Sequence, residues 1–339
     1  MAILVTGGTG YIGSHTTVEL LSVNEDVIIV DNLSNSKALV LDRIEKITGK
    51  RPTFYKVDLL NKEDLNEVFV KHPEIDSVIH FAGLKAVGES CQKPLLYYHN
   101  NITGTLNLID CMLQNKVNRI VFSSSATVYG VPKTVPIRED FPTSTTNPYG
   151  ETKLMIEHIL KDVCTANPEF SACVLRYFNP IGAHESGLIG EDPKGIPNNL
   201  LPYVTQVAIG KLDYLRVFGN DYPTHDGTGV RDYIHVVDLS LAHLDALKYT
   251  EKLIGIDYIN VGTGKGYSVL DIVNAFGSVW GSPIKYVITD RRPGDVAECY
   301  ADPTKAFKVL GWKAKYDLTR MCTDSARWQR NNPNGYPEE

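Results

Sequence analysis

A tyrosine and a lysine stand four residues apart in the segment NPYGETK, residues 147–153. On a helix this spacing places Tyr149 and Lys153 on one face, a turn apart. A cationic ammonium near a phenol favours the phenolate, so the pair predicts a tyrosine that acts as a base below its usual pKa of about 10. The plainer interpretation is an ordinary helix start with a surface tyrosine and a solvated lysine. The elements that surround the pair must decide between the two.

A glycine-rich loop lies near the start of the chain, in VTGGTGYIG. Gly8, Gly10 and Gly13 fit the G-x-G-x-x-G spacing, and Gly7 adds a G-x-x-G-x-x-G pattern. The loop follows a predicted strand and opens a helix, where glycine lets backbone N–H groups approach a pyrophosphate. Asp31 ends the next strand, and a carboxylate there accepts from both ribose hydroxyls but repels a 2′-phosphate. The loop therefore predicts a site for NAD rather than NADP.

Short β-branched runs alternate with amphipathic helical stretches over the first half of the chain. Six runs are typical of buried strands in a parallel sheet, at residues 2–7, 27–31, 53–58, 77–83, 119–125 and 172–179. Alternation repeated this often predicts an α/β fold with a doubly wound parallel sheet, the Rossmann arrangement.

The pattern breaks after residue 179, and the stretch 180–235 is rich in Gly, Pro, Asn and Asp. We expect an NAD-binding domain over 1–179 and a second, smaller α/β lobe over 180–339 that binds substrate. Some chain is expected to pass between the two. Later periodic segments, such as 236–250 and 258–262, are assigned to the smaller lobe.

Polar residues follow the third and fourth predicted strands, at the sheet edge where ligands bind in open α/β folds. Asp58 ends the third strand and can accept from the adenine amine, or it can cap the following helix. Phe81, Ala82 and Lys85 follow the fourth strand in HFAGLKAVGES. Lys85 can pair with a phosphate, or it can be an ordinary surface lysine.

The catalytic candidates reach the same edge. Ser125 ends the fifth strand in FSSSATVYG, and the helix of Tyr149 and Lys153 follows it. A hydroxyl, a phenol and an ammonium thus converge on the nicotinamide end of the predicted dinucleotide site. This convergence favours the catalytic interpretation of all three residues.

The composition excludes several other classes of protein. With 43% apolar and 22% charged residues the chain is typical of a globular protein, and its net charge of −6 gives no basic footprint for nucleic acid or membrane. No apolar run approaches the ~20 residues that span a bilayer, and the start lacks the basic segment of a signal peptide. The six cysteines are scattered and the nine histidines lack metal-ligand spacing. We expect a cytoplasmic enzyme with reduced thiols and no metal.

The chain resembles the extended short-chain dehydrogenase/reductase family, and within it the UDP-glucose 4-epimerases, over essentially its whole length. The segments that carry the resemblance are GGTGYIGSH, FAGLKAVGES, NNITGT, SSSATVYG, PYGETK, RYFNPIGAH, FGNDYPTHDGTGVRDYIHV and RRPGD. The glycine loop and the Y-x-x-x-K pair are shared across the superfamily, whereas the last two segments are typical of sugar-nucleotide enzymes. The resemblance implies a homodimer, with its helices at about 94–115 and 148–167 in the contact, that interconverts UDP-galactose and UDP-glucose in galactose metabolism.

The same resemblance implies a role for each catalytic candidate. Tyr149 would take the proton from the sugar 4-hydroxyl while a hydride passes from C4 to NAD. Lys153 would hold the nicotinamide ribose and, with the cationic ring, lower the pKa of Tyr149, while Ser125 would hydrogen-bond the sugar oxygen. The 4-ketose would then turn about its link to the diphosphate and take the hydride back on its other face. This inverts C4 and regenerates tightly bound NAD.

Two larger sets of binding residues follow from the resemblance. Those expected to contact NAD are Gly7, Gly10, Tyr11, Ile12, Gly13, Asp31, Asn32, Asp58, Leu59, Phe81, Ala82, Lys85, Asn100, Ser123, Tyr149, Lys153 and Phe178. Those expected to contact the UDP-hexose are Ser125, Asn179, Asn199, Leu200, Phe218, Arg231, Tyr233, Arg292, Asp295 and Cys299. In the second set, the arginines would bind the diphosphate, Phe218 would stack on uracil and Asp295 would accept from a ribose hydroxyl.

Cys299 falls where relatives carry either a bulky tyrosine or a small residue beside the sugar cavity. A small side chain leaves room for UDP-N-acetylglucosamine and UDP-N-acetylgalactosamine, or Cys299 simply packs as a small buried residue.

Three other functions stay open: a sugar-nucleotide 4,6-dehydratase, a catalytically silent NAD-binding protein, and a dehydrogenase that releases NADH. A dehydratase of this type places acids directly after the strand of Ser125, where this chain has ATV at 126–128. A silent protein typically loses the tyrosine or the lysine.

Overall fold

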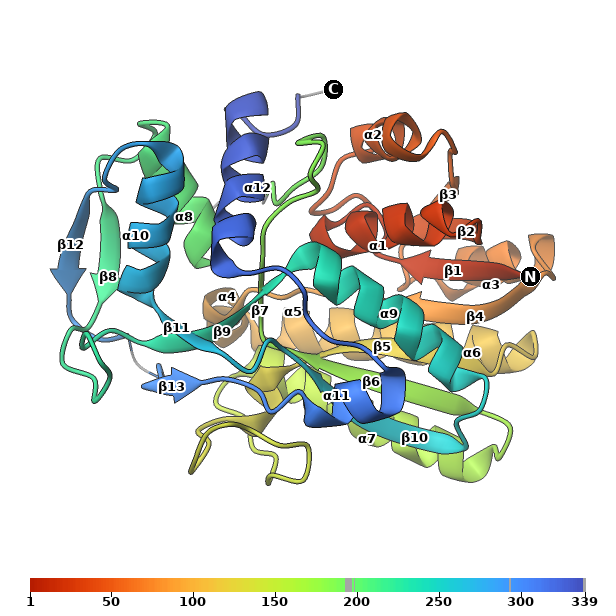
Figure 1. Cartoon of the computed structure of the whole chain (residues 1–339). Helices are drawn as coiled ribbons and strands as arrows, with labels where there is room; N and C mark the ends of the chain where they lie inside the picture. The colour runs from red at the N-terminus through yellow and green to blue at the C-terminus, as the bar shows by residue number, and fades with distance from the viewer. Residues whose placement is uncertain (193–196, 198, 293, 338–339) are drawn as a thin grey trace.

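A seven-stranded parallel sheet forms the centre of the computed structural model, which describes residues 1–192, 197, 199–292 and 294–337 (Figure 1). The strand order is β10-β6-β5-β4-β1-β2-β3, and every neighbouring pair is parallel. The strands are β1 (Ala2–Thr6), β2 (Asp26–Asp31), β3 (Thr53–Lys56), β4 (Ile75–His80), β5 (Arg119–Ser125), β6 (Ser171–Tyr177) and β10 (Gly255–Val261). The order reverses between β1 and β4, and open α/β sheets bind ligands at the carboxyl ends beside such a switch point.

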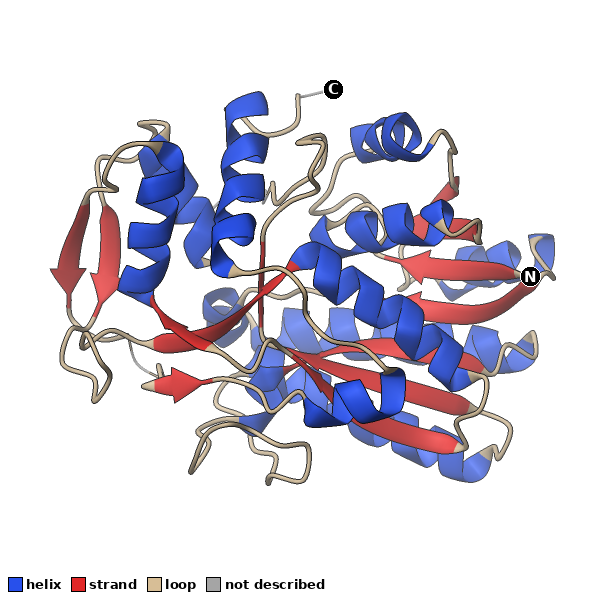
Figure 2. Cartoon of the chain, in the orientation of Figure 1, coloured by secondary structure: helices blue, strands red, loops and turns tan. Residues whose placement is uncertain are grey.

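Helices cover both faces of the sheet (Figure 2). One face carries α1 (Tyr11–Ser22), α2 (Leu39–Thr48), α9 (Val236–Thr250) and α11 (Thr304–Leu310). The other face carries α3 (Lys62–Lys71), α6 (Gly104–Gln114) and α7 (Pro148–Ala166). Shorter pieces complete the connections: α4 (Val87–Gln92), α5 (Pro94–Tyr98), a π-helical turn over His99–Thr103 and a 3₁₀ turn over Ala126–Tyr129. The predicted α/β, doubly wound class is confirmed.

A smaller lobe stands beyond the carboxyl edge of the sheet. Its four-stranded sheet joins β7 (Asn179–Ile181), β9 (Val230–His235), β11 (Gly266–Ser268) and β13 (Glu298–Cys299). A parallel pair is formed by β8 (Leu215–Phe218) and β12 (Tyr286–Thr289). The helices α8 (Leu200–Ala208), α10 (Val269–Trp280) and α12 (Leu318–Asn331) pack on these strands around an apolar core. Figure 1 shows α12, near the C-terminus, within this lobe.

The chain returns from the smaller lobe to the large sheet. The sequence assigned the segments 236–250 and 258–262 to the smaller lobe, and this placement was wrong. β10 pairs with β6 along all seven of its residues, and α9 packs beside α1. The reason is burial. Ile259 and Val261 of β10 lie in the apolar core of the large sheet, and β10 covers the edge that β6 would otherwise leave open. A domain boundary near residue 179 stays a proposal, with 236–261 as exchanged chain.

None of the helices in the described part of the chain is long and apolar enough to cross a membrane.

Candidate active site

The glycine loop packs directly against the loop that follows β4. Gly7 has a φ of +70°, and a Cβ built on it would lie 2.8 Å from the backbone nitrogen of Ala82. A Cβ on Gly13 would lie 2.3 Å from the carbonyl oxygen of Gly7. Both positions therefore require glycine. Gly10 is the N-cap of α1, so the free N–H groups of the first helical turn lie at this edge, where they suit a pyrophosphate.

Asp31 stands beside this loop at the end of β2. Its buried carboxylate accepts hydrogen bonds from the Thr9 backbone N–H (3.2 Å), the Leu33 N–H (2.9 Å) and the Ser36 hydroxyl (3.1 Å). These donors fix the carboxylate next to the glycine loop. The position is the one that a ribose-binding acid occupies in a dinucleotide fold.

Asp58 lies next to Asn32, so the second and third strands bring two of the predicted cofactor residues together. The Asn32 amide donates to Asp58 Oδ2 (2.9 Å), and the Leu60 N–H donates to Asp58 Oδ1 (2.9 Å). The alternative that Asp58 caps the next helix was wrong, because Asn61 is the N-cap of α3 and accepts from the Asp64 N–H (3.3 Å).

Ser125, Tyr149 and Lys153 meet between the end of β5 and the start of α7. Asn147 caps this helix by accepting from the Gly150 N–H (2.8 Å), with Pro148 in its first turn. Tyr149 thus stands in the first turn and Lys153 one turn later, on the same side. The Ser125 hydroxyl lies close enough to the Tyr149 phenol to lower its pKa. The Lys153 ammonium donates to the Ser123 carbonyl oxygen (2.7 Å) and lies 4.9 Å above the Phe122 ring.

The electrostatics of this group differ from the sequence expectation. Burial raises the pKa of Tyr149 above its usual value, and the nearby Ser125 hydroxyl lowers it only in part. Burial also lowers the pKa of Lys153 to about 8, against the Glu157 carboxylate, which raises it. For the chain alone, burial outweighs any effect of Lys153 on the pKa of Tyr149. That Lys153 lowers this pKa together with the cationic nicotinamide ring stays a prediction. A low-dielectric site disfavours both charged forms, and the ammonium is bonded to a carbonyl rather than to the phenol.

The sequence missed Asn101, which holds the loop after β4 against the catalytic helix. Asn101 is buried; its side-chain oxygen accepts from the Leu84 N–H (2.8 Å), and its amide donates to the Leu84 carbonyl (3.0 Å) and the Thr152 hydroxyl (3.0 Å). Asn100, a predicted NAD contact, donates to the same Asn101 oxygen (3.0 Å). The signal in the sequence was a run of two asparagines inside an otherwise helical stretch, and that run forms a π-helical turn, a feature frequent at functional sites.

Glu191 brings a predicted cofactor residue and a predicted substrate residue together across the two lobes. The Asn199 amide donates to Glu191 Oε1 (2.7 Å), and the Lys85 ammonium lies 3.4 Å from the same oxygen. Asn199 is the N-cap of α8, so Leu200 begins that helix as predicted. Lys85 is exposed and stands at the mouth of the site.

Four predicted substrate residues form one group at the far end of the smaller lobe. Arg292 donates to Asp295 Oδ2 (3.0 Å) and its guanidinium lies 4.8 Å above the Phe218 ring. Arg231 lies 3.8 Å from Asp295 Oδ1, while its guanidinium also donates to the backbone oxygens of residues 230 and 296. An aromatic ring, two cations and a carboxylate suit a nucleoside diphosphate.

Tyr233 and Asn179, two further predicted substrate residues, lie on the strands next to this group. They are register partners in the parallel pair of β7 and β9. Tyr233 is buried in the apolar core of the smaller lobe, and burial raises its pKa to about 12 while the nearby Arg231 and Arg292 lower it in part.

Cys299 and Phe178 share an apolar cluster near the reacting residues. Phe178 is buried, and the half-buried Cys299 packs against a group whose other members are Ala126, Val128, Tyr129, Val135, Ile137, Phe141, Leu154 and Ala301. Burial raises the pKa of the Cys299 thiol to about 11, so it stays neutral.

The remaining predicted NAD contacts lie on several elements of the large sheet and its helices. The Tyr11 hydroxyl donates to the Gly182 carbonyl (2.7 Å), which ties α1 to the smaller lobe. Ile12 and Leu59 pack on opposite faces of the large sheet. Ser123 contributes the carbonyl that holds Lys153, and Phe81 packs on His243 with ring centroids 4.7 Å apart.

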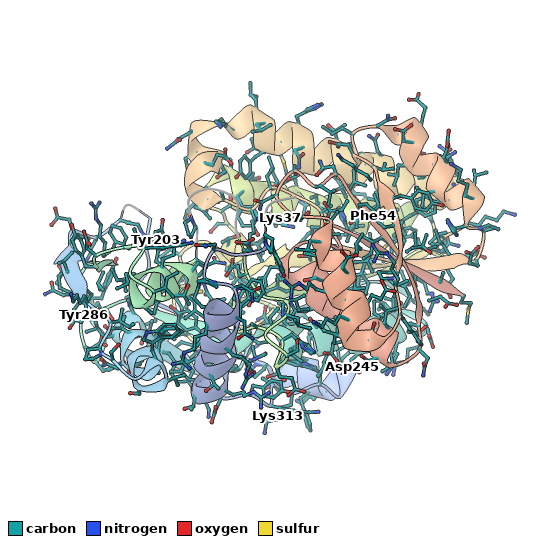
Figure 3. All side chains as sticks on the ribbon, turned by 90° about the horizontal axis from the view of Figure 1, so that it is seen from above. Lys37, Phe54, Tyr203, Asp245, Tyr286 and Lys313 are labelled. Carbon is teal, nitrogen blue, oxygen red and sulfur yellow. The ribbon has the colours of Figure 1, made fainter. Side chains whose placement is uncertain are left out.

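Lys37 links the loop after β2 to the smaller lobe and to the end of the chain. Its ammonium donates to the Tyr336 carbonyl (2.8 Å) and lies 3.4 Å from Asp192, whose other contact is the Tyr336 N–H (2.9 Å). In the view from above, Lys37 lies between Tyr203 of the smaller lobe and Phe54 of the large one (Figure 3). These contacts close the two lobes on the side of Asp31.

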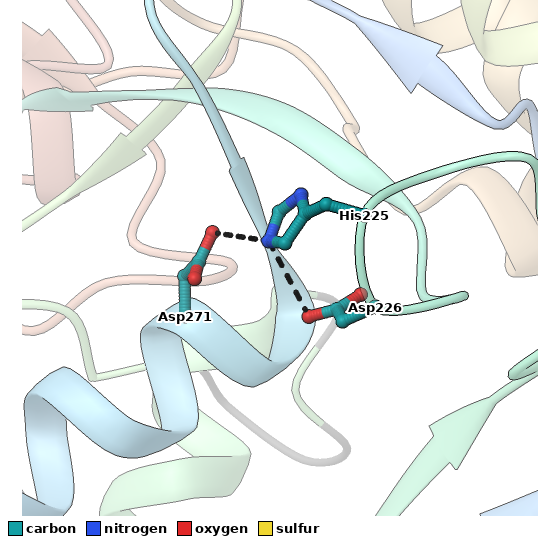
Figure 4. Close-up of side chains that lie close together, drawn as sticks. All are labelled: His225, Asp226 and Asp271. Atoms are coloured by element: carbon teal, nitrogen blue, oxygen red, sulfur yellow. Dashed lines mark ion pairs between the residues drawn. The ribbon is translucent and has the colours of Figure 1, made fainter.

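Among the described residues, one group could bind a cation: His225, Asp226 and Asp271 (Figure 4). The imidazole lies 3.7 Å and 3.3 Å from the two carboxylates. Both carboxylates already serve local structure, because Asp226 accepts from the Thr228 N–H (2.9 Å) and Asp271 completes the capping box of α10. We assign no metal to this group.

Known proteins are similar to this chain over nearly its whole length. A family model described as GDP-mannose 4,6 dehydratase matches residues 4–325. A UDP-glucose 4-epimerase of Bacillus subtilis is 62% identical over 336 residues, which cover 99% of each chain. A UDP-glucose 4-epimerase of Bifidobacterium longum, solved with NAD+ and UDP, superimposes with a TM-score of 0.96 at 54% identity, covering 99% of this chain and 100% of the other. A UDP-Glc/GlcNAc 4-epimerase of Campylobacter jejuni superimposes with a TM-score of 0.85 at 39% identity, with coverages of 97% and 99%.

Proposed function

The chain belongs to the UDP-glucose 4-epimerase family of extended short-chain dehydrogenase/reductases, and on that premise we propose how its residues interconvert UDP-galactose and UDP-glucose. One observation carries the proposal: Ser125, Tyr149 and Lys153 stand at the same sheet edge as the glycine loop and Asp31. A proton acceptor and a dinucleotide site thus share one edge of the sheet.

The phenol of Tyr149 is the proton-transfer group of this mechanism. As the phenolate, which the Lys153 ammonium together with the cationic ring of bound NAD would favour, it takes the proton of the sugar 4-hydroxyl. As the resulting phenol it gives the proton back after the ketose has turned, while the Ser125 hydroxyl holds the same oxygen. Lys153, bonded to the Ser123 carbonyl, presents its charge to the nicotinamide ribose and to the phenol. NAD supplies the redox chemistry when bound, as acceptor and donor of the C4 hydride, and it is regenerated in each turnover.

In this proposal the UDP part of the substrate is bound by the smaller lobe, away from the sugar C4. We assign the diphosphate to Arg231 and Arg292, the uracil to Phe218 and the ribose hydroxyls to Asp295, whose present ion pairs with the arginines keep these groups in place. Asn179, Asn199 and Leu200 add polar backbone and amide groups on the diphosphate side. A firm grip at this end leaves the hexose free to present either face to the nicotinamide.

The direct assay is conversion of UDP-galactose to UDP-glucose by the purified protein with no NAD added, followed by chromatography. We expect conversion without added cofactor and no lasting absorbance at 340 nm, since no net oxidation occurs. A lasting rise in absorbance with NAD supplied would identify a dehydrogenase that releases NADH, and no reaction even with NAD would favour a silent binding protein.

The 4,6-dehydratase alternative lacks the residues that the second half of that reaction needs. Residues 126–128 lie in the 3₁₀ turn over Ala126–Tyr129, which follows Ser125, and their side chains are Ala, Thr and Val. Thr127 donates from its N–H (3.2 Å) and its hydroxyl (3.0 Å) to Ser125 Oγ. The turn positions Ser125 and offers no carboxylate to remove water from the sugar.

Cys299 predicts a second pair of substrates. Cys299 is a small side chain in the same apolar cluster as Phe178 and as Leu154, which follows Lys153. Because such a residue beside the hexose leaves room for an N-acetyl group, we propose that UDP-N-acetylglucosamine and UDP-N-acetylgalactosamine are also interconverted. Cys299→Tyr is expected to lower this activity at least about 10-fold, in the range that small changes of pocket shape produce, while UDP-galactose conversion stays within about 2-fold. Chromatography of both substrate pairs checks it. Equal losses for the two pairs, or no wild-type activity on the N-acetylated pair, would contradict the assignment.

We propose a homodimer built on the helices at about 94–115 and 148–167. Large apolar side chains are exposed on α4 to α7: Val87, Leu95, Leu96, Leu106 and Met155. Such a patch marks an interaction surface. Light scattering is expected to give twice the chain mass of 37.6 kDa, and Leu95→Asp with Leu106→Asp to give the monomer. Ile254→Asp is the control, because Ile254 is 89% exposed on the loop between α9 and β10 and belongs to none of these helices. A monomeric wild type would overturn the proposal.

We also propose that the enzyme acts in the cytoplasm, in galactose metabolism. All six cysteines are free, four of them buried, which suits a reducing compartment.

A further inference from the structure

A buried ion pair lies directly beneath the reacting residues and has no role in the mechanism above. Glu157 of α7 is 1% exposed and Arg176 of β6 is 4% exposed. Arg176 donates from Nε to Glu157 Oε1 (3.0 Å) and from Nη2 to Oε2 (2.6 Å). The Ser124 hydroxyl of β5 donates to the same Oε1 (2.6 Å). One carboxylate therefore ties a helix to two neighbouring strands.

Each member of this group is next to a residue of the site. Ser124 lies between Ser123, whose carbonyl holds Lys153, and Ser125. Glu157 is one helical turn after Lys153, and Ser124 and Arg176 are register partners in the β5–β6 pair. Because side chains alternate along a strand, Ser124 and Arg176 point to the face of the sheet that α7 covers, while Ser125 ends the strand at the substrate edge. The network thus fixes how α7 is rotated about its axis and how far it lies from β5 and β6.

Further contacts hold Arg176 in place. Its Nη1 donates to the Tyr129 hydroxyl (2.9 Å), and its guanidinium lies 4.9 Å and 4.7 Å from the rings of Tyr129 and Tyr258. A buried ion pair is weak evidence for stability, because well-packed apolar residues often replace it without loss. What this pair provides here is a set of directed bonds, because the Glu157 carboxylate accepts from both Arg176 and Ser124.

We propose that Glu157 is a positioning residue, which through Ser124 and Arg176 holds α7 so that Tyr149 and Lys153 stand in reacting geometry with Ser125. The assignment rests on the proposed function of that site.

The charge of Glu157 also acts on Lys153. Two other titratable groups lie near this ammonium: His80 of β4, whose pKa burial lowers to about 3, and Tyr149, whose pKa burial raises. Arg176 is neutralised by the ion pair itself. Because the Glu157 carboxylate raises the pKa of Lys153, its loss lowers that pKa further, and Lys153 then loses its proton at a lower pH.

Two variants separate position from charge. Ser124→Ala removes one arm of the network and leaves every charge in place; we expect kcat to fall about 10-fold, with an unchanged KM for UDP-galactose and an unmoved pH profile. Glu157→Gln removes the charge; we expect kcat to fall about 100-fold, with its alkaline limb shifted to lower pH. Glu19→Gln of α1, a half-buried glutamate away from the site, is the matched control and should leave kcat and the profile unchanged.

All rates are measured per folded, NAD-loaded enzyme, beside the wild type. An inactive wild type would overturn the proposed function itself. With an active wild type, the positioning role is contradicted if Ser124→Ala keeps full kcat, or if Glu157→Gln loses only thermal stability while its pH profile stays in place. If Glu157→Gln does not fold, kcat of Ser124→Ala alone decides.

Discussion

Tyr149→Phe is expected to lower kcat by a factor of about 10²–10⁴, the usual contribution of a positioned proton-transfer group. The substitution removes only the hydroxyl that lies near Ser125, because the helix cap at Asn147 and the packing of the ring are unchanged. The KM for UDP-galactose and the bound NAD should therefore stay close to wild type. Initial rates of UDP-glucose formation, with NAD released by denaturation and quantified, check both expectations.

The control for Tyr149→Phe is the same change at Tyr55, whose hydroxyl bonds to His72 Nε2 (2.8 Å) beside β3. Tyr55→Phe should leave kcat unchanged. A Tyr149→Phe enzyme with more than about a tenth of the wild-type kcat would assign the proton transfer to another group, with Ser125 as the next candidate.

Gly13→Ala is expected to abolish NAD binding and to lower the free energy of unfolding by about 1–3 kcal/mol or more, as overpacking does. The added methyl group would meet the Gly7 carbonyl oxygen at 2.3 Å and the Gly8 Cα at 2.8 Å. These atoms belong to backbone, which cannot turn aside as a side chain does, so α1 must move away from the loop. The N–H groups of its first turn then no longer line the pyrophosphate site.

The matched change at Gly88 of α4 should leave both properties intact, because a Cβ there meets nothing within 4 Å. Denaturant unfolding and NAD content of the two variants make the comparison. Full NAD content in Gly13→Ala would remove the glycine loop from the cofactor site.

The sequence predicted those parts of the fold that depend on local pattern. The segment 119–125 matches β5 at both ends, and the helix expected at NPYGETK begins at Pro148 because Asn147 caps it. The glycine loop and Asp31 could be placed together because a strand, a tight turn and a helix follow one another with fixed lengths. These features need no information from distant parts of the chain.

The parts that could not be predicted depend on long-range packing. The composition of β10 would suit a strand of either lobe. Its place in the large sheet follows only from its pairing with the otherwise open edge of β6. The pKa of Tyr149 depends on how deeply the fold buries it, which the spacing of two residues does not contain. In the sequence, Glu157 is only a polar residue on a predicted helix. Its proposed role depends on its contacts with Ser124 and Arg176, which lie 33 and 19 residues away along the chain.

The most direct test of the central claim follows the hydrogen at C4. UDP-galactose with deuterium at C4 is incubated with the purified enzyme in ordinary water, without added NAD, and the UDP-glucose formed is analysed by mass spectrometry and NMR. Return of the same hydride to the other face of the ketose predicts that the product keeps the deuterium at C4. Product that carries solvent hydrogen at C4 would contradict transient oxidation by a bound cofactor.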